Sequence, residues 1–258
     1  GEQNQGAILH RYMLGVYDFL ERLHERYPDL LIEGCSGGGG RFDAGMLYYT
    51  PQIWCSDNTD AIERVKIQYG TSFAYPSCTV GSHVSAVPNH QTGRTTELAT
   101  RAAVAMSGSF GYELDLNLLT EEEKEQVRAQ IKNYHRFEML IRQGRYYRLT
   151  DVWQKKEYAA WEYCRPDGGE ALVTVVTLDT QCNPATEYVK LRGLGEDKKY
   201  RVEVVGMLTG GENGQRINET PNSVEPEYFT GAQLVYAGVP VSRLGNEYRA
   251  WQVYIKEV

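Results

Sequence analysis

The first 150 residues alternate between helical apolar stripes and short apolar runs. From 7 to 27, apolar residues recur with the period of one helix face, and Pro28 ends the pattern. The runs DLLIEGC (29–35), PQIWCSD (51–57) and TSFAYPSCT (71–79) predict short strands buried on both faces. Helices are predicted at 58–70, with Gly70 as C-terminal cap, at 96–116, running into a glycine-rich turn, and at 120–144, with a Thr120–Glu123 capping box.

Beyond Tyr146 the pattern changes to β-rich runs between turn residues, at 170–180, 187–194, 199–207 and 247–258, without a convincing helix. The predicted fold class is therefore α/β plus β, with an α/β part at 1–148 and an antiparallel sheet or small sandwich at 149–258. Three parallel βα units alone would leave strand edges unpaired, which folded proteins rarely tolerate. The first part is thus predicted to belong to a larger parallel α/β fold.

Composition narrows the class of protein. The 258 residues are 41% hydrophobic and carry a net charge of -7, which disfavours nucleic acid or an anionic membrane as partner. No apolar run approaches the roughly 20 residues of a membrane span, and no secretion signal is predicted. The five cysteines contain no C-x-x-C spacing, so neither a disulfide framework nor a zinc site is indicated. We expect a cytoplasmic protein without metal or cofactor.

Two carboxylates follow the second predicted strand, in IWCSDNTDA (53–61). Asp57 leaves the carboxyl end of that strand, where parallel α/β sheets place their chemistry, and is a candidate catalytic acid. Asp60 could equally cap the next helix, because carboxylates favour helix N-termini.

A four-glycine loop follows the first predicted strand, in EGCSGGGGRFD (33–43). It fits neither phosphate-binding glycine motif, so it forms either a tight turn or a close approach to a flat sugar face. By itself, Cys35 is expected to be a buried apolar residue. Trp54 either stacks on a sugar or packs in the core.

Several neighbouring residues have structural interpretations. Arg41 and Asp43 are predicted to pair with each other, and Glu33 to be hydrogen-bonded scaffold inside a buried strand. His83 and His90 are too isolated to indicate a metal site or a nucleophilic dyad, so structural roles are expected.

Four blocks together resemble the bacterial α-galactosidases of glycoside hydrolase family 36, over about residues 5 to 150 and more loosely beyond. They are EGCSGGGGRFD, PQIWCSDNTDAIERVKIQYGTS, GSHVSAVPNHQTGR and MSGSFGYELDL. The resemblance implies the C-terminal strands and helices of a (β/α)₈ TIM barrel followed by an antiparallel β-domain. It implies a retaining enzyme with Asp57 as general acid/base, Cys35 and Gly38 contacting galactose in the −1 subsite, and Trp54 at the pocket wall. At Cys55, many members have threonine.

One motif of that family is missing. Its nucleophile is the aspartate of a Lys-Trp-Asp motif, whereas the four tryptophans here are followed by Cys, Gln, Glu and Gln. We therefore expect a fragment of an exo-α-galactosidase acting on melibiose or raffinose, inactive alone, whose intact form is a homo-oligomer. The alternatives are a raffinose-synthase-like galactosyltransferase, an α-N-acetylgalactosaminidase, or a non-catalytic carbohydrate-binding module with the β-rich tail as its working part.

Overall fold

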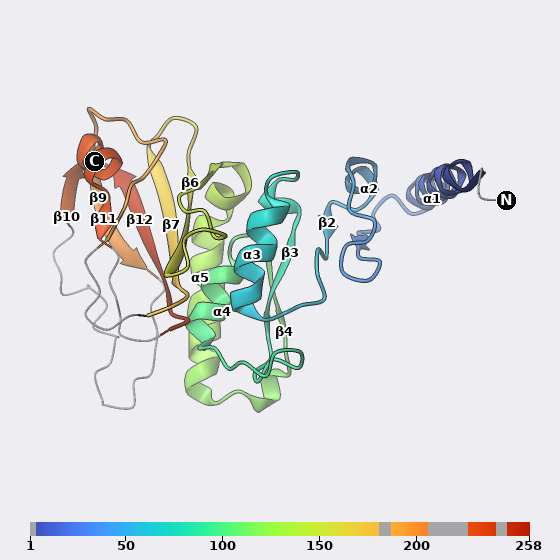
Figure 1. The fold of residues 1–258 in the computed structure, drawn as a ribbon, viewed down its shortest axis with the longest axis horizontal. Helices are drawn as coiled ribbons and strands as arrows, with labels where there is room; N and C mark the ends of the chain where they lie inside the picture. Colours follow the sequence, from blue (N-terminus) through green and yellow to red (C-terminus); the bar gives the residue numbers. More distant parts are fainter. Residues whose placement is uncertain (1–3, 181–186, 206–226, 241–246) are drawn as a thin grey trace.

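The computed structural model describes residues 4–180, 187–205, 227–240 and 247–258. Its N-terminal part alternates helices with short strands (Figure 1). In chain order these are α1 (Gln5–Arg26), β1 (Glu33–Gly34), α2 (Ala44–Tyr49), β2 (Gln52–Ile53), α3 (Ala61–Thr71), η2 (Ser77–Thr79), β3 (Gly81–Ser85), α4 (Leu98–Ala105), β4 (Ser109–Glu113), η3 (Leu116–Leu118) and α5 (Glu121–Gln143).

The four strands of this part run parallel. β1 pairs with β2 and β3 with β4, while a parallel bridge between Ile53 and Val80 joins the two pairs. The order in space is therefore the order in sequence, as in consecutive units of a βα barrel. The long helices at the start and at the end of the N-terminal part, α1 and α5, were predicted correctly, and the Thr120–Glu123 capping box that begins α5 is confirmed.

Two strand predictions were wrong. Residues 71–79, expected to be a strand, form the end of α3, a turn and η2, and the strand lies at β3 instead. The expected glycine-rich turn is the strand β4. Gly108, just before β4, and Gly111, within it, allow close packing: a Cβ on Gly108 would lie 2.5 Å from the Val80 carbonyl oxygen, and one on Gly111 3.0 Å from the His83 ring. The Gly70 cap was also wrong, since α3 continues to Thr71 and Ser72 is its C-cap.

The described residues of the C-terminal part, here called the β-domain, form an antiparallel sheet of six strands in the order β10-β9-β12-β7-β6-β5. A second sheet pairs β11 with β8. The elements are β5 (Arg145–Arg148), β6 (Tyr158–Cys164), β7 (Glu170–Thr177), β8 (Tyr188–Val189), β9 (Lys199–Val205), β10 (Glu227–Thr230), the π-helical turn η4 (Gln233–Ala237), β11 (Val239–Pro240) and β12 (Ala250–Glu257).

The fold class, α/β followed by antiparallel β, is confirmed. The expectation of no helix in the tail was wrong at η4, and residues 206–207 of one predicted run lie outside the described residues. The large sheet begins at Arg145, and the domain boundary at 148 stays a prediction.

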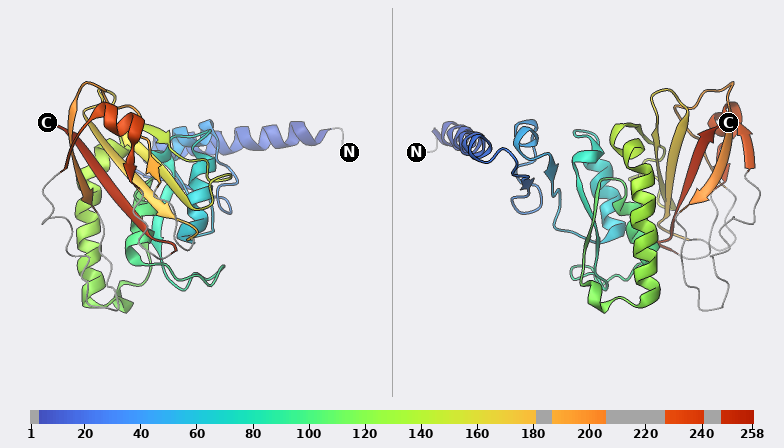
Figure 2. Two further views of the ribbon diagram at one scale, coloured as in Figure 1. Left: turned by 60° about the vertical axis from the view of Figure 1, so that its left-hand side comes forward. Right: turned by 180° about the vertical axis from the view of Figure 1, so that it is seen from behind.

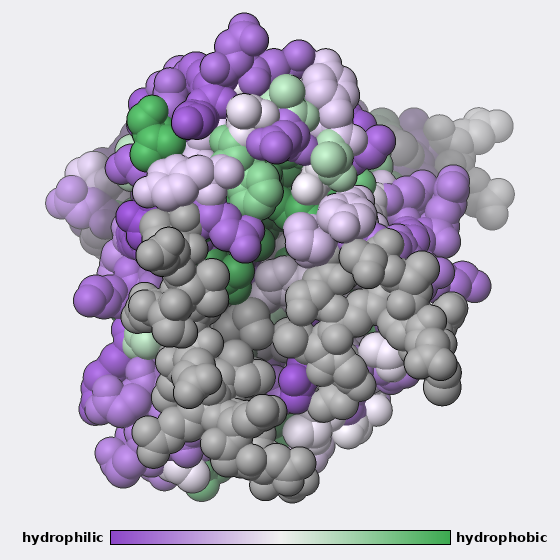
Figure 3. Space-filling model, turned by 90° about the vertical axis from the view of Figure 1, so that its left-hand side faces the viewer, coloured by the Kyte–Doolittle hydropathy of each residue, from purple (hydrophilic) through white to green (hydrophobic). Residues whose placement is uncertain are grey.

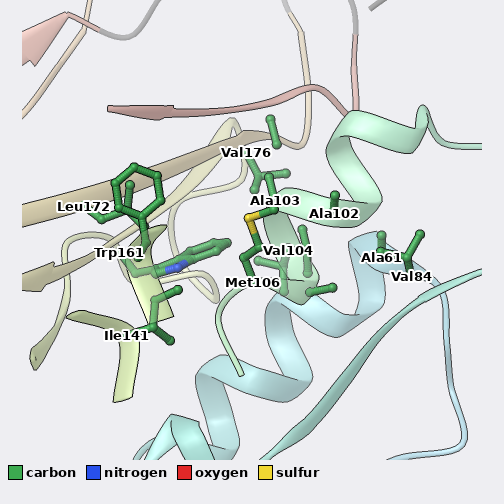
Figure 4. Packing of buried hydrophobic residues seen from close by; sticks show 14 of the residues in the cluster. Ala61, Val84, Ala102, Ala103, Val104, Met106, Ile141, Trp161, Leu172 and Val176 are labelled. Carbon is green, nitrogen blue, oxygen red and sulfur yellow. The ribbon is translucent and has the colours of Figure 1, made fainter. Parts of the chain in front are cut away.

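The central strands β6, β7 and β12 of the large sheet are buried on both faces over most of their length, which explains their nearly continuous apolar runs. One face packs on α4 and α5, with Trp161, Leu172 and Val176 against Ala103 and Met106 in the same cluster (Figure 4). The other face packs under β8, η4 and β11 around a second cluster that includes Leu191, Leu234 and Trp251. Seen from this end, the described surface is mostly hydrophilic around a small apolar area (Figure 3).

At the opposite end, α1 lies apart from the main body and contacts α2 (Figures 1 and 2). Leu31, in the run predicted to be buried on both faces, is 87% exposed, and Glu33 is exposed as well. That prediction was wrong for this run: β1 pairs with β2, but the side chains of Leu31 and Glu33 are not covered by other described elements. Several apolar residues of α1 are also exposed, among them Ile8, Leu9 and Phe19.

Candidate active site

The glycine loop after β1 turns back over the end of β2. Residues 36–39 all have positive φ, between 65° and 91°. Residues with a Cβ adopt this conformation at a cost, so glycine is favoured there. The amides of Gly39 and Gly40 donate to the carbonyls of Cys35 and Ser36, at 3.1 Å each, and close the turn. The glycine run is therefore required by the backbone of this loop.

The loop packs directly against the backbone that carries Asp57. A Cβ on Gly38 would lie 2.8 Å from the Asp57 backbone nitrogen and 3.4 Å from its carboxyl carbon. A Cβ on Gly39 would lie 3.0 Å from the Cys55 Cα. The structure thus brings together Gly38 and Asp57, from loops that follow two neighbouring parallel strands. Asp57 and Cys35 are both exposed, so the expectation from its residue type that Cys35 would be buried was wrong.

Asp57 lies in a turn that its own polar neighbours hold in place. The Ser56 hydroxyl accepts a hydrogen bond from the Asn58 amide at 3.1 Å, and the Asn58 side chain accepts one from the Asp60 amide at 3.1 Å. Asp60 then accepts from the Ile62 amide at 2.8 Å and caps α3. An exposed carboxylate on a fixed turn at the end of a parallel strand is suited to proton transfer.

Asp60 caps α3, and its carboxylate is engaged by neighbouring groups. Its side chain is 1% exposed and accepts hydrogen bonds from the Thr92 hydroxyl and the Arg94 guanidinium. Burial raises the pKa of this carboxyl, but the bonds from Thr92 and Arg94 outweigh burial and hold the pKa below its usual value.

Trp54 lies between β2 and the Asp57 turn, and its ring packs against side chains of this chain. Its ring stacks on His83 with 4.8 Å between the centroids and 23° between the planes. The Arg64 guanidinium lies 4.7 Å from the Trp54 ring centroid. His83 Nδ1 lies 3.5 Å from a Glu113 carboxylate oxygen, so His83 has the structural contacts expected for it. Trp54 remains half-buried beside the turn.

Arg64 is a residue that the sequence analysis missed. It is 3% exposed and donates to the Ser56 carbonyl at 3.2 Å, to the Gly81 carbonyl and to the Gln68 side chain at 3.1 Å. Its guanidinium therefore ties the strand end before Asp57 to the next strand. An arginine inside the apolar stripe of the predicted helix, between Ile62 and Val65, was the available signal.

Two structural predictions near the loop need correction. Arg41 does not pair with Asp43: Arg41 donates to the Tyr12 hydroxyl at 2.9 Å. Asp43 accepts from the Tyr17 hydroxyl and the Met46 amide, each at 2.8 Å, because it caps α2. Glu33 is hydrogen-bonded as expected, to the Gln52 side chain at 2.7 Å, but it is exposed.

A groove of about 560 Å³ lies between α1 and β1 and is bordered by Cys35 and Ser36 at the site end. Within the described part of the chain, no three His, Cys, Asp or Glu side chains are grouped so that they could hold a metal ion. Cys35, Cys55, Cys78 and Cys164 are free thiols, and Cys182 lies outside the described residues. Across the same residues, no helix has the length and apolar character of a membrane span.

Comparison with known proteins agrees with this geometry. The melibiase family model matches residues 1–144, and the model of the glycosyl hydrolase family 36 C-terminal domain matches residues 158–255. The chain therefore belongs to the melibiases of glycoside hydrolase family 36.

Among curated proteins, the chain is 53% identical over 253 residues to the bifunctional alpha-galactosidase/sucrose kinase AgaSK of Mediterraneibacter gnavus, covering 98% of this chain and 25% of that protein. It is 49% identical over 210 residues to alpha-galactosidase AgaA of Geobacillus stearothermophilus, covering 81% of this chain and 29% of AgaA. The chain thus spans between a quarter and a third of the length of these relatives.

Solved structures show the same arrangement. The galactosidase domain of AgaSK superposes with a TM-score of 0.85 at 53% identity, over 96% of this chain and 32% of that one. A variant of the Geobacillus stearothermophilus AgaA in complex with raffinose superposes with a TM-score of 0.86 at 41% identity, over 100% of this chain and 33% of AgaA.

Proposed function

We propose that this chain supplies the acid/base half of the active site of a retaining exo-α-galactosidase acting on melibiose- or raffinose-type substrates. The observation that carries the proposal is the packing of Gly38 against Asp57 at the ends of two neighbouring parallel strands. The names of the relatives, which are alpha-galactosidases, and the raffinose complex of one of them support the substrate class.

Asp57 is the proposed general acid/base. In a retaining glycosidase, one carboxyl group protonates the departing glycosidic oxygen while a second carboxylate attacks the anomeric carbon. The first group then takes a proton from the water that releases the sugar. An exposed side chain on a fixed turn allows Asp57 to serve both steps.

Cys35, Gly38 and Trp54 are the proposed contacts of the −1 subsite. Cys35 and Asp57 are exposed on loops that follow adjacent strands, and Gly38 has no side chain to keep a sugar from approaching the backbone. The indole of Trp54, fixed by His83 and Arg64, would form a wall of the pocket.

The nucleophile is proposed to lie outside this chain. A retaining site needs its second carboxylate about 5 to 5.5 Å from the first. The two aspartates nearest Asp57 in the sequence are engaged elsewhere, since Asp60 caps α3 beside Arg94 and Asp43 caps α2. We therefore expect no turnover from this chain alone.

The test is release of 4-nitrophenol from 4-nitrophenyl α-galactoside by the purified chain and by the full-length gene product, side by side. Activity in the full-length protein only is the expected result, and turnover by the short chain would contradict it. The α-N-acetylgalactosaminide assayed in parallel distinguishes that substrate class. We also propose that the enzyme is cytoplasmic and homo-oligomeric. The free cysteines support the cytoplasmic location. The family resemblance supports the homo-oligomer, which light scattering of the full-length protein tests.

A further inference from the structure

Among the described residues of the β-domain, Tyr248 contacts the loop that holds the Asp57 turn. The segment before β12 carries Tyr248, and the Arg94 guanidinium lies 5.0 Å from the centroid of the Tyr248 ring. Nη1 of Arg94 also pairs with the Asp60 carboxylate. Arg94 thus contacts both an aromatic ring of the β-domain and the buried carboxylate that ends the turn bearing Asp57.

The loop between β3 and α4, residues 86–97, holds that turn at two points. The Asn89 side chain donates to the Thr59 hydroxyl at 2.9 Å. Thr92 and Arg94 donate to Asp60, as described above. Both anchors lie within three residues of Asp57, so a shift of the loop would move the turn.

The position of the Tyr248 ring is set by its backbone. Tyr248 has φ of 60°, a left-handed conformation that a non-glycine residue adopts only when its surroundings impose it. Its amide donates to the Thr177 carbonyl of β7 at 3.0 Å, and its carbonyl accepts from the Thr100 hydroxyl of α4 at 2.8 Å. The backbone that carries the ring is therefore held by both parts of the chain.

The Arg94–Tyr248 contact is a cation–π interaction, because Arg94 keeps its charge. Burial lowers the pKa of this guanidinium, but the hydrogen bond and charge of Asp60 more than offset burial and raise the pKa above its usual value. A guanidinium on an aromatic face is attracted to the ring and loses freedom to reorient.

We propose that the β-domain takes part in catalysis through Tyr248, a positioning residue that holds Arg94 against Asp60 and so fixes the turn that carries Asp57. The proposal rests on the acid/base role proposed for Asp57. An acid must stay aligned with the glycosidic oxygen in the transition state, and small misplacements lower the rate of proton transfer steeply.

A misplaced acid has a signature that simple loss of folded enzyme lacks. Melibiose has a sugar alkoxide as leaving group and needs full protonation, whereas 4-nitrophenolate leaves with little help. In the full-length gene product, we expect Tyr248→Leu to lower kcat/KM for melibiose about 3- to 30-fold, the range of one lost cation–π contact. The value for 4-nitrophenyl α-galactoside should fall less than about 3-fold. Tyr248→Phe keeps an aromatic face and should behave like wild type.

A second contact of the same chemistry provides the control. Arg136 of α5 lies 4.7 Å from the ring centroid of Tyr254 in β12, at the same junction between the two parts of the chain. Arg136→Met should leave the ratio of the two kcat/KM values unchanged. If Tyr248→Leu fails to fold, Arg94→Lys, which keeps the charge beside Asp60 but loses the planar stack, should shift the ratio in the same direction.

Two results for Tyr248→Leu would overturn the proposal. One is an equal loss of kcat/KM on both substrates, and the other is wild-type kinetics in a folded variant. Where Tyr248→Leu does not fold, the same two results for Arg94→Lys would overturn it. Asp57→Ala, measured alongside, separates this inference from the proposed function. If Asp57→Ala loses melibiose hydrolysis while Tyr248→Leu is unaffected, only the inference fails. If Asp57→Ala keeps wild-type activity, the acid/base assignment fails, and the inference with it.

Discussion

A methyl group added at Gly38 should lower activity through two effects that a neighbouring glycine separates. The first is conformational, since Gly38 has φ of 73°, where an L-residue costs about 1 kcal/mol. The second is steric, because the new Cβ would lie 2.8 Å from the Asp57 backbone nitrogen. Gly37 has φ of 65° but nothing within 4 Å of its added Cβ. Gly37→Ala therefore carries the first effect alone.

The size of the steric effect follows from the geometry. Ordinary contact begins at about 3.4 Å, so the Asp57 backbone or the glycine loop must move by about 0.6 Å. A misplacement of 1 Å at a reacting group costs about 100-fold in rate. In the full-length enzyme we expect Gly38→Ala to lower kcat for melibiose by about 10- to 100-fold.

The assay compares both variants by steady-state kinetics and thermal unfolding. Both should lose about the same stability through the shared conformational cost of about 1 kcal/mol, and so lower the melting temperature, with a further loss in Gly38→Ala from the clash. Only Gly38→Ala should lose kcat. Equal kcat in the two variants would refute the reasoning that Gly38 is required by its approach to Asp57.

Two further predictions concern buried charges. Burial raises the pKa of Glu162 to about 8, although its carboxylate accepts from the Arg192 amide, so the folded state binds the proton more tightly than the unfolded state. The free energy of unfolding should therefore fall as pH rises from about 5 to 8, by up to about 1.4 kcal/mol per pH unit. Urea unfolding of the chain at several pH values should show that dependence, and Glu162→Gln should lose it. The same pH dependence in both proteins would contradict the assignment. Arg64→Met leaves the Ser56 and Gly81 carbonyls without their donor, which should cost about 1–3 kcal/mol for each; a loss below about 1 kcal/mol in urea titrations would show that the guanidinium is not needed there.

The helices were predictable where the local signal was strong. The spacing of apolar residues along α1 and the capping box of α5 each depend on residues within one or two helical turns. The local sequence therefore contains all the information that predicts these helices. Strand β4 was missed because Gly108, just before it, and Gly111, within it, indicate a turn locally, whereas in the structure they allow close packing against the β3 segment. Strand β6 was missed because both of its faces are buried, which removes the alternation that marks a strand.

The predictable part of the site follows from one rule, that parallel α/β sheets place their chemistry at the carboxyl ends of their strands. Asp57 and Gly38 follow neighbouring parallel strands, so their proximity could be expected from the order of elements. Arg94 and Tyr248 could not be placed beside Asp60 in this way. Arg94 lies 34 residues from Asp60, and the Tyr248 backbone is held by Thr100 from 148 residues away. Contacts of this range are set by tertiary packing and leave no local pattern.

The most direct test of the central claim is the product that Asp57→Ala forms with azide in the full-length enzyme. Without its acid/base, the enzyme should still form the galactosyl-enzyme from 4-nitrophenyl α-galactoside and then lack the group that activates water. Azide needs no such activation, so it should restore turnover and yield α-galactosyl azide, with the anomeric configuration retained. No rescue, or β-galactosyl azide as product, would contradict the assignment of Asp57 as the general acid/base.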